Sequence, residues 1–271
     1  MMQVSHESPL ALLERSRAYN DYSYALVHLF EKYPRYLDFF KEEKKIGRKV
    51  LLDNSMFELR KAFDADKFAQ WILTLNPDEY IVPDVFSDSG ATIFSFESWK
   101  KNYPNIPGCS IGVVQGKTYQ EIINCYRYLS VYADKIAFSF ECPYFRSIGF
   151  SLRHDATEWE RLASGRVSLI RDLIADGIWN PNKPHHLLGC AVPQEFAYYG
   201  SINIESIESI DTSNPVVAGM HGVRYNDGGL RDKITAKLAD MLEYPITEKN
   251  WEDINYNLTM FRKINRIEKI Y

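Results

Sequence analysis

The stretch IESIDTSNPVVAG (Ile207–Gly219) decides the fold. In it a short apolar run ends at one aspartate, Asp211, which a polar turn follows. The Thr, Ser, Asn and Pro that follow favour a turn and end the strand-like run. Catalytic groups of a parallel α/β barrel lie at the carboxyl ends of several strands. Four earlier apolar runs also end on polar residues: VLLDNS on Asp53, YIVPD on Asp84, IGVVQG on Gln115 and KIAFSF on Ser139. The repetition therefore predicts an α/β fold of the (β/α)8 TIM-like barrel class with one convergent site.

Helix-like segments alternate with these runs. Residues 34–47 start with Pro and stop at Gly, as helices do. Asp64 or Asp66 offers an N-cap to the next helix, and Thr118 with Glu121 has the spacing of a capping box. We expect the first strand at Tyr22–Phe30, the sixth at the start of HHLLGCAVPQEF and the seventh at IESID. We expect helices at 34–47, 64–78, 89–104, 118–133, 160–177 and 193–200.

The remaining segments interrupt or extend this alternation. The segment Glu141–Glu160 is long and aromatic, as lids or specificity loops are. Its rings could stack an extruded base, although loop aromatics more often pack the loop itself; they are Tyr144, Phe145 and Phe150. Residues 219–227 are expected to hold the eighth strand, and 229–242 a helix. The whole of 1–271 is expected to be one catalytic barrel domain, with 248–271 as a C-terminal helical extension.

Composition excludes several classes of protein. The chain has 271 residues, of which 45% are hydrophobic and 25% charged, so it can bury a large core. A formal net charge of -4 argues against a protein that coats nucleic acid, although it allows a local basic face. No apolar run approaches the length of a membrane span, and the first residues lack the layout of a secretion signal. We expect a cytoplasmic protein without a membrane partner.

The cysteines and histidines predict no metal site. Four cysteines lie far apart and form no CxxC pair or Cys/His cluster, so reduced thiols are expected at Cys109, Cys125, Cys142 and Cys190. None of the histidines shows the spacing of metal ligands. We therefore expect neither a metal nor another cofactor.

Four motifs follow one another in the order VLLDNSMFE, IGVVQGKTYQEII, HHLLGCAVPQEF and IDTSNPVVAG. By order and spacing, over residues 49–219, they resemble the DSGGFQ, IVQG, LMGVGxPEDL and FDCVxPTR elements of the tRNA-guanine transglycosylase superfamily. The resemblance is narrower to its compact phage-type members, which place 7-deazaguanine bases in DNA. A cytoplasmic location would then be that of a cell or of a phage-infected host.

The resemblance implies a role for each matched residue. Asp211 would be the nucleophile and Asp53 the general acid/base. Asp84 and Gln115 would hydrogen-bond the purine, and Gly189 would let the backbone approach it. Three further positions complete the implied substrate-binding set: Gly116, Ser139 and Cys190. As a cysteine alone, Cys190 is interpreted as a small packing residue.

The sequence also departs from the family. The Gly-Gly pair after the fifth strand is replaced by Ser139 and Phe140, which implies a base pocket of different shape. The arginines of the PTR element have no counterpart after Asn214 in this motif. The CxCxxC…H zinc element of the tRNA enzymes is missing from the sequence. These departures favour DNA over tRNA as the nucleic-acid partner.

The chemistry of these groups fits base exchange. One carboxylate must attack C1′ while guanine leaves, and a second group must move protons for the leaving and entering bases. Two aspartates can divide these roles if their environments separate their pKa values. A third carboxylate and an amide can recognise the N–H, amino and carbonyl groups of a guanine edge. Each aspartate alone could be a cap or turn residue, but four such groups in register favour a site.

The expected function is therefore that of a transglycosylase that replaces guanine in a nucleic acid, DNA rather than tRNA, with a 7-deazaguanine base. Within enzymes, the alternative is a nucleoside or glycoside hydrolase that uses the same aspartates with water as the acceptor. From a different class, the alternative is a barrel without catalytic activity that binds nucleic acid as a scaffold subunit.

Overall fold

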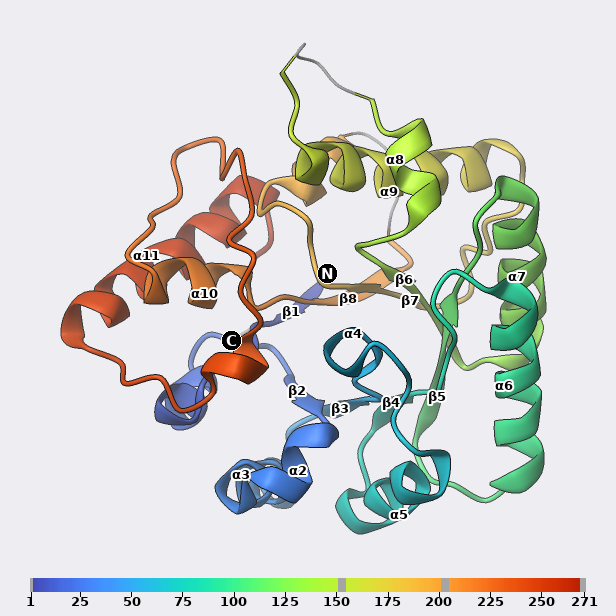
Figure 1. The fold of residues 1–271 in the computed structure, drawn as a ribbon, viewed down its shortest axis with the longest axis horizontal. Coiled ribbons are helices and arrows are strands. Elements are labelled where there is room, and N and C mark those ends of the chain that lie inside the picture. Colours follow the sequence, from blue (N-terminus) through green and yellow to red (C-terminus); the bar gives the residue numbers. More distant parts are fainter. Residues whose placement is uncertain (1, 151–154, 201–204, 269–271) are drawn as a thin grey trace. The chain divides into compact units, whose positions relative to one another are not determined.

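The computed structural model describes residues 2–150, 155–200 and 205–268. In this part of the chain, eight strands form one sheet in the order β1-β8-β7-β6-β5-β4-β3-β2, and helices alternate with the strands (Figure 1). All the strand pairs whose register is described are parallel. The fold is a (β/α)8 TIM barrel with a C-terminal helical extension, as the sequence predicts.

The strands are β1 (Gln3–Ser5), β2 (Ser23–Leu26), β3 (Val50–Asp53), β4 (Glu79–Ile81), β5 (Cys109–Val114), β6 (Lys135–Ser139), β7 (His185–Leu188) and β8 (Ile207–Asp211). The α-helices are α1 (Leu13–Ser16), α2 (His28–Lys32), α3 (Pro34–Lys45), α4 (Met56–Leu59), α5 (Ala65–Leu75), α6 (Ser89–Asn102), α7 (Tyr119–Tyr132), α8 (Pro143–Ile148), α9 (Glu158–Ala175), α10 (Asn214–Met220) and α11 (Glu248–Asn265). Short 3₁₀ helices are η1 (Leu10–Leu12), η2 (Glu195–Tyr199) and η3 (Leu238–Met241).

The chain divides into two compact units. Unit 1 comprises Met1–Asp21, Ser139–Asn182 and Leu187–Tyr271, and unit 2 comprises Tyr22–Phe138 and Lys183–His186. The single-domain organisation expected from the sequence stays a prediction.

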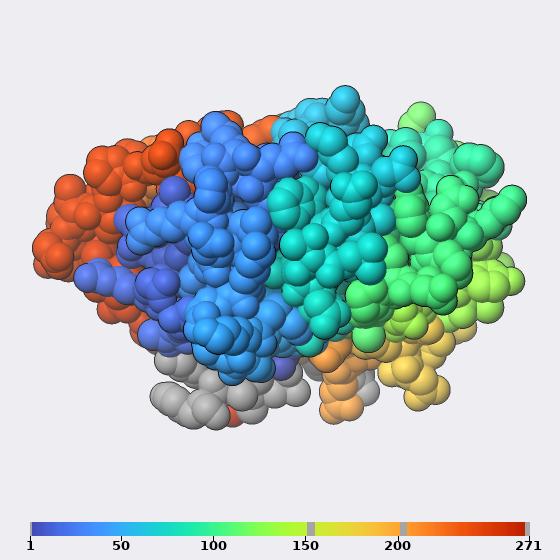
Figure 2. Space-filling model, turned by 90° about the horizontal axis from the view of Figure 1, so that it is seen from below, coloured from blue at the N-terminus to red at the C-terminus, as the bar shows by residue number. Residues whose placement is uncertain are grey.

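Unit 2 contains the parallel ladder from β2 to β6. Register pairs such as Leu26 with Asp53 and Val114 with Phe138 align the carboxyl ends of neighbouring strands. Every residue of β3 is buried, as expected for a strand covered on both faces. Helices α6 and α7 lie side by side (Figure 1), and Figure 2 shows the surface of this unit from blue through cyan to green.

Two helix starts in unit 2 follow the capping residues seen in the sequence. The Asp64 side chain accepts a hydrogen bond from Lys67 N at the start of α5. The Thr118 hydroxyl accepts one from Glu121 N at the start of α7. Both bonds satisfy backbone N–H groups that the first helical turn leaves without partners.

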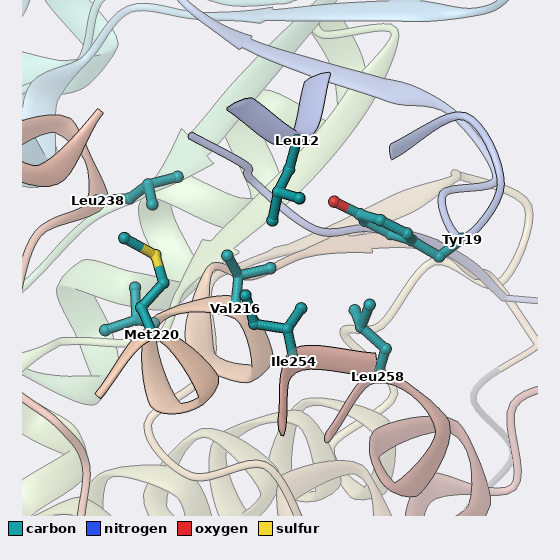
Figure 3. Packing of buried hydrophobic residues seen from close by; sticks show 8 residues of the cluster. Leu12, Tyr19, Val216, Met220, Leu238, Ile254 and Leu258 are labelled. Carbon is teal, nitrogen blue, oxygen red and sulfur yellow. The ribbon is translucent and has the colours of Figure 1, made fainter. Parts of the chain in front are cut away.

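Unit 1 pairs the first strand with the last, since Ser5 of β1 lies opposite Asp211 of β8. Next to this pair, α10 and α11 pack together, and their apolar side chains meet those of η1 and η3 (Figure 3). At Gly219 a Cβ atom would lie 2.5 Å from Ile254 N, so the close approach of α11 to α10 requires glycine. The cluster comprises Leu12, Tyr19, Val216, Val217, Met220, Leu238, Ile254 and Leu258.

Two strand predictions are wrong. Tyr22–Phe30 is neither the first strand nor a single strand, since it divides into β2 and α2, and β1 precedes it at Gln3–Ser5. A strand of three residues is too short to show an alternating pattern. The predicted eighth strand at 219–227 is also absent from its place, because these residues finish α10 and enter a turn closed by a bridge between Asn226 and Gly229.

Two helix predictions also need correction. Residues 229–242 contain only η3, because the Gln194 side chain bonds both backbone groups of Leu230 and holds the chain away from a helix. The segment 193–200 contains η2, a 3₁₀ helix of five residues, in place of an α-helix. The terminal helix is confirmed as α11, which starts with a capping box of Thr247 and Asn250.

Within the described residues, no helix combines the length and the hydropathy that crossing a membrane requires.

His6, next to β1, gives the fold a pH dependence that can be measured. Its ring packs edge-on against Phe261 with ring centroids 5.2 Å apart. Burial, helped by the charge of Arg262, lowers the pKa of His6 to about 3. Below the ordinary pKa of 6.5, the unfolded chain binds a proton at His6 that the folded chain does not bind. His6 therefore lowers the free energy of unfolding as the pH falls from that value towards 3.

We expect His6→Leu to reduce the slope of the unfolding free energy against pH by up to about 1.4 kcal/mol per pH unit. The measurement is urea unfolding of wild type and variant at several pH values between 7 and 4.5, which isolates His6 as a difference in slope. His221→Leu, at an exposed histidine, is the matched control and should keep the wild-type slope. Equal slopes for wild type and His6→Leu would contradict the prediction.

Candidate functional site

In unit 2, one carboxylate is held between two amides at the ends of β3, β4 and β5. Asn54 Nδ2 donates to Asp84 Oδ1 at 3.0 Å, and Gln115 Nε2 donates to Asp84 Oδ2 at 2.7 Å. The Gln115 amide is itself fixed, because its Oε1 accepts from Ser87 N at 2.8 Å. We call Asn54, Asp84 and Gln115 the Asp84 network.

Burial dominates the electrostatics of this network. It raises the pKa of the Asp84 carboxyl above its ordinary value, and the hydrogen bonds from Asn54 and Gln115 offset this only in part. Each Asp84 oxygen accepts one of these bonds and keeps a lone pair for a further hydrogen bond. The network can therefore accept hydrogen bonds from a planar polar ligand.

Asp53 ends β3 immediately before Asn54, and donors reach both of its oxygens. Tyr24 Oη donates to Oδ2 at 2.8 Å, and Ser55 N donates to Oδ1 at 3.2 Å. The Tyr24 ring stacks on His186, with centroids 6.3 Å apart and planes 17° apart. Ser55 has a φ of 60°, so the chain turns sharply just after the aspartate. Asp53 is therefore held in one orientation by a tyrosine and a turn.

In unit 1, Asp211 ends β8 and is 4% exposed. The Gly189 N–H lies 3.3 Å from both carboxylate oxygens and donates to them. Beside it, Cys190 Sγ and Thr212 Oγ1 are 3.1 Å apart and share a hydrogen bond. We call Asp211, Gly189, Cys190 and Thr212 the Asp211 cluster, and its bonds tie the end of β7 to the end of β8.

The thiol of Cys190 is not a nucleophile at neutral pH. Burial raises its pKa to about 12, so the reactive thiolate is scarce. Its contact with Thr212 fits the interpretation of Cys190 as a small packing residue. Burial also raises the pKa of Cys142.

The structure joins some of the predicted site residues and not others. Asp84 and Gln115 are hydrogen-bonded to each other, and Asp53 precedes their partner Asn54 in the sequence. Asp211, Gly189 and Cys190 belong to the Asp211 cluster. Gly116 allows close packing, because a Cβ there would lie 2.9 Å from Ile122 N. The Ser139 hydroxyl accepts from Glu141 N at 3.3 Å. That all eight serve one site stays a prediction.

Phe140, which replaces a glycine of the resembling family, fills space beside the Asp211 cluster. It is 7% exposed, and a Cβ at Gly189 would lie 2.7 Å from its Cδ1. Lys233 Nζ lies over the Phe140 ring, 3.9 Å from its centroid, and 5.1 Å from that of Trp159. Burial lowers the pKa of Lys233. Lys233 belongs to a basic stretch in a segment expected to be a helix, and the sequence did not indicate that it would lie over aromatic rings.

Other contributors were missed for a common reason. Tyr24, Asn54 and Thr212 act by contacts across strands, and periodicity does not specify such contacts. Arg166 did leave a signal, since it is a charged residue on the apolar face of α9 between Leu162 and Ile170. It forms a fully buried ion pair with Glu195 at 2.6 Å.

One ring of the aromatic segment after β6 packs against the following helix. Phe145 of α8 is 2% exposed and contacts α9 at Gly165, where a Cβ would lie 2.6 Å from the Cβ of Phe145. Residues 151–154 of the expected lid lie outside the described residues.

Unit 1 also has a cavity of about 510 Å³. None of the eight residues predicted to catalyse or to bind substrate lines it, but Phe150, a ring that could stack a base, does. Its lining includes Phe150, Glu160, Gln194, Tyr198, Asp227 and Arg231.

No cluster of three or more His, Cys, Asp or Glu side chains within residues 2–150, 155–200 and 205–268 is arranged to hold a metal ion. No family model matches the sequence, and no curated protein is significantly similar to it. The resemblance to the transglycosylase superfamily therefore stays a prediction.

The packing of Gly189 predicts a coupling with Phe140. Gly189 has a φ of 58°, and Gly177 has a φ of 66° with no atom within 4 Å of the position that a Cβ would occupy. Gly177→Ala should cost about 1–2 kcal/mol of unfolding free energy from the backbone alone. Gly189→Ala should cost a further ~1–3 kcal/mol from the clash with the Phe140 ring.

Denaturant unfolding of the two alanine variants, of Phe140→Leu and of Gly189→Ala/Phe140→Leu measures this coupling. We expect Phe140→Leu to relieve part of the cost of Gly189→Ala, because the smaller side chain makes room for the methyl group. Strictly additive free energies would show that Phe140 does not restrict the position of Gly189.

Proposed function

We propose that the protein is a base-exchange transglycosylase that replaces guanine in a nucleic acid with a 7-deazaguanine base through a covalent aspartyl-glycosyl intermediate. Asp211 is the nucleophile and Asp53 the general acid/base in this proposal. The base is bound by Asp84 and Gln115. DNA is the favoured substrate, because the sequence lacks the arginines and zinc ligands found in the tRNA enzymes it resembles.

The observation that carries the proposal is the Asp84 network beside Asp53. A guanine edge presents N–H and amino donors next to a carbonyl acceptor, and a carboxyl group flanked by amides offers the complementary groups. The network lies at the carboxyl ends of three consecutive parallel strands, where barrel enzymes bind their substrates. Asp53, one residue before Asn54, is within the same turn and can act on the bound base.

The reaction has two balanced halves. In the first, an Asp211 carboxylate oxygen forms a bond to C1′ as the C1′–N9 bond breaks, and the departing guanine takes a proton from Asp53. In the second, the incoming base gives its ring N–H proton to the Asp53 carboxylate. Its nitrogen then bonds to C1′, and the ester bond to Asp211 breaks. Both aspartates return to their starting states.

Two features of the Asp211 cluster suit this role. The Gly189 N–H fixes the carboxylate by contacting both oxygens, and it withdraws little charge because each contact is long at 3.3 Å. Thr212 and Cys190 secure the turn that follows β8. A nucleophile held in one orientation loses less entropy on reaching the transition state.

The two aspartates should respond differently to substitution. Asp211→Ala cannot form the ester, so exchange should fall by several orders of magnitude while the free base still binds. Asp53→Asn keeps the nucleophile but removes proton transfer, so exchange should fall about 10²–10⁴-fold and the covalent adduct should accumulate. Asp88→Asn, at the N-cap of α6, is the matched control and should keep wild-type exchange.

The measurement mixes each variant with guanine-containing DNA, and separately with tRNA, together with a 7-deazaguanine. Mass spectrometry of the bases then detects exchange, and denaturing gels detect nucleic acid attached to protein. Full exchange by Asp211→Ala would show that the nucleophile is wrong. Release of guanine without incorporation would identify a hydrolase, and binding without any chemistry a scaffold.

Nucleic-acid binding should depend steeply on salt, because a chain with a net charge of -4 must use a local basic face. On duplex DNA, each phosphate contact should add about −0.9 to the slope of log K against log salt concentration. Fluorescence anisotropy with labelled DNA measures this slope. Salt concentrations between roughly 50 and 200 mM are suitable, because affinities of this kind change steeply there. Affinity that does not change with salt would point to a protein partner or a small-molecule substrate instead.

A further inference from the structure

We propose that the buried ion pair of Arg166 and Glu195 is a positioning device that aims the Gly189 N–H at the Asp211 carboxylate. Arg166 lies on α9 and Glu195 starts η2, so neither was among the expected site residues. The functional part of this inference rests on the proposed role of Asp211 as the nucleophile.

Three nitrogen atoms of Arg166 donate hydrogen bonds to groups between Leu188 and Glu195. Its Nε donates to Glu195 Oε1 at 2.6 Å, its Nη1 to the Leu188 carbonyl at 2.9 Å and its Nη2 to the Gly189 carbonyl at 2.7 Å. Glu195 Oε2 in turn accepts from Ala191 N at 3.2 Å. The pair therefore holds the backbone from Leu188 to Ala191 at three points.

Because the peptide is planar and trans, holding the Leu188 carbonyl also sets the direction of the Gly189 N–H. The Leu188 carbonyl and the Gly189 N–H belong to the same planar peptide and point in opposite directions. The described residues contain no cis peptide bond. The Leu188 carbonyl accepts from Arg166 Nη1 and from the Phe140 N–H, each at 2.9 Å, so the Gly189 N–H is directed to the other side, where Asp211 accepts it at 3.3 Å. We assign to Arg166 the part of this orientation that the Phe140 N–H leaves open.

The surroundings leave this peptide little freedom to rotate. Gly189 adopts a φ of 58°, and the Phe140 ring lies against its α-carbon. Both side chains of the ion pair are completely buried, so water cannot replace either partner. A guanidinium is suited to this task, since its planar fork of donors can bind two carbonyls and a carboxylate at once.

A purely structural role would not require these residue types. Buried ion pairs are often replaced by apolar side chains with no loss of stability. The neighbouring positions of the same helix face, Leu162, Leu169 and Ile170, are apolar and buried. The charge at Arg166 interrupts this face where Arg166 binds the carbonyls of Leu188 and Gly189.

The main test is Arg166→Lys, which keeps the charge but cannot span both carbonyls and the carboxylate. Glu195→Gln is the second variant, to be used with the same readouts if Arg166→Lys fails to fold. Arg262→Lys is the matched control, because Arg262 also binds a backbone carbonyl, that of Tyr19, and a carboxylate, that of Asp21, each at 3.0 Å.

The first readout does not need any enzymatic activity. The sequence contains one Leu-Gly dipeptide, Leu188–Gly189, so carbonyl-¹³C leucine with ¹⁵N glycine selects a single amide signal in NMR spectra. In the wild-type background, Asp211→Asn should shift this signal, because it changes the acceptor of the Gly189 N–H. In the Arg166→Lys background, the shift caused by Asp211→Asn should largely disappear, and with Arg262→Lys it should persist.

The second readout is kinetic. At temperatures where all variants are folded, Arg166→Lys should lower kcat for base exchange by up to ~10²-fold and change KM for the free base little, as expected for a misplaced reacting group. Arg262→Lys should keep the wild-type kcat. A Gly189 signal that responds to Asp211→Asn equally with and without Arg166 would overturn the proposal, and so would equal losses of kcat in the two lysine variants.

The two proposals can fail separately. If wild-type protein exchanges no base but Arg166→Lys uncouples the Gly189 signal from Asp211, the proposed function is wrong and the orientation of the peptide by Arg166 stands. If wild-type protein exchanges guanine and the coupling survives in Arg166→Lys, the function stands and the positioning role is wrong.

Discussion

A carboxylate buried at the end of a strand must find hydrogen-bond donors, and this requirement determines the surroundings of the candidate residues in each unit. Each of the three strand-end aspartates has obtained donors of a different kind. Asp53 has the hydroxyl of Tyr24, Asp84 has two side-chain amides and Asp211 has a backbone N–H. Because unpaired buried charges are so costly, these donors fix the orientation of each carboxylate.

The three environments also differ in what they allow chemically. Asp84 lies deep enough that burial outweighs its amide donors and raises its pKa, which suits a group that binds by hydrogen bonding. Asp211 accepts from the Gly189 N–H in long contacts of 3.3 Å, which suits its proposed role as the nucleophile. The proposed division of binding and chemistry among the aspartates follows these differences in their donors.

The sequence predicted the parts of the fold that depend on local patterns. Apolar runs ending on polar residues located β3, β4, β5, β6 and β8, and the caps at Asp64 and Thr118 located two helix starts. It failed where contacts between residues distant in the sequence decide the conformation. The strand Gln3–Ser5 is defined only by its pairing with β8, and the chain around Leu230 is held by the distant side chain of Gln194.

The same distinction between local patterns and tertiary contacts applies to the site residues. Aspartates at strand ends are visible in a sequence, because each lies next to the pattern that predicts the strand. Their partners Tyr24 and Asn54, and the Arg166 and Glu195 pair behind Gly189, are specified by tertiary packing and became apparent only in the structure. A charged residue within an apolar helix face, as at Arg166, is the one signal that could have been used.

The pairing of β1 with β8 has a consequence for synthesis on the ribosome. Most of unit 2 is one continuous segment, so its strands can pair as soon as they emerge. The strand near the start of the sequence must instead wait for its partner strand until the segment that carries Asp211 has been made. A ribosome that stalls before β8 would release a chain able to form the Asp84 network but lacking Asp211.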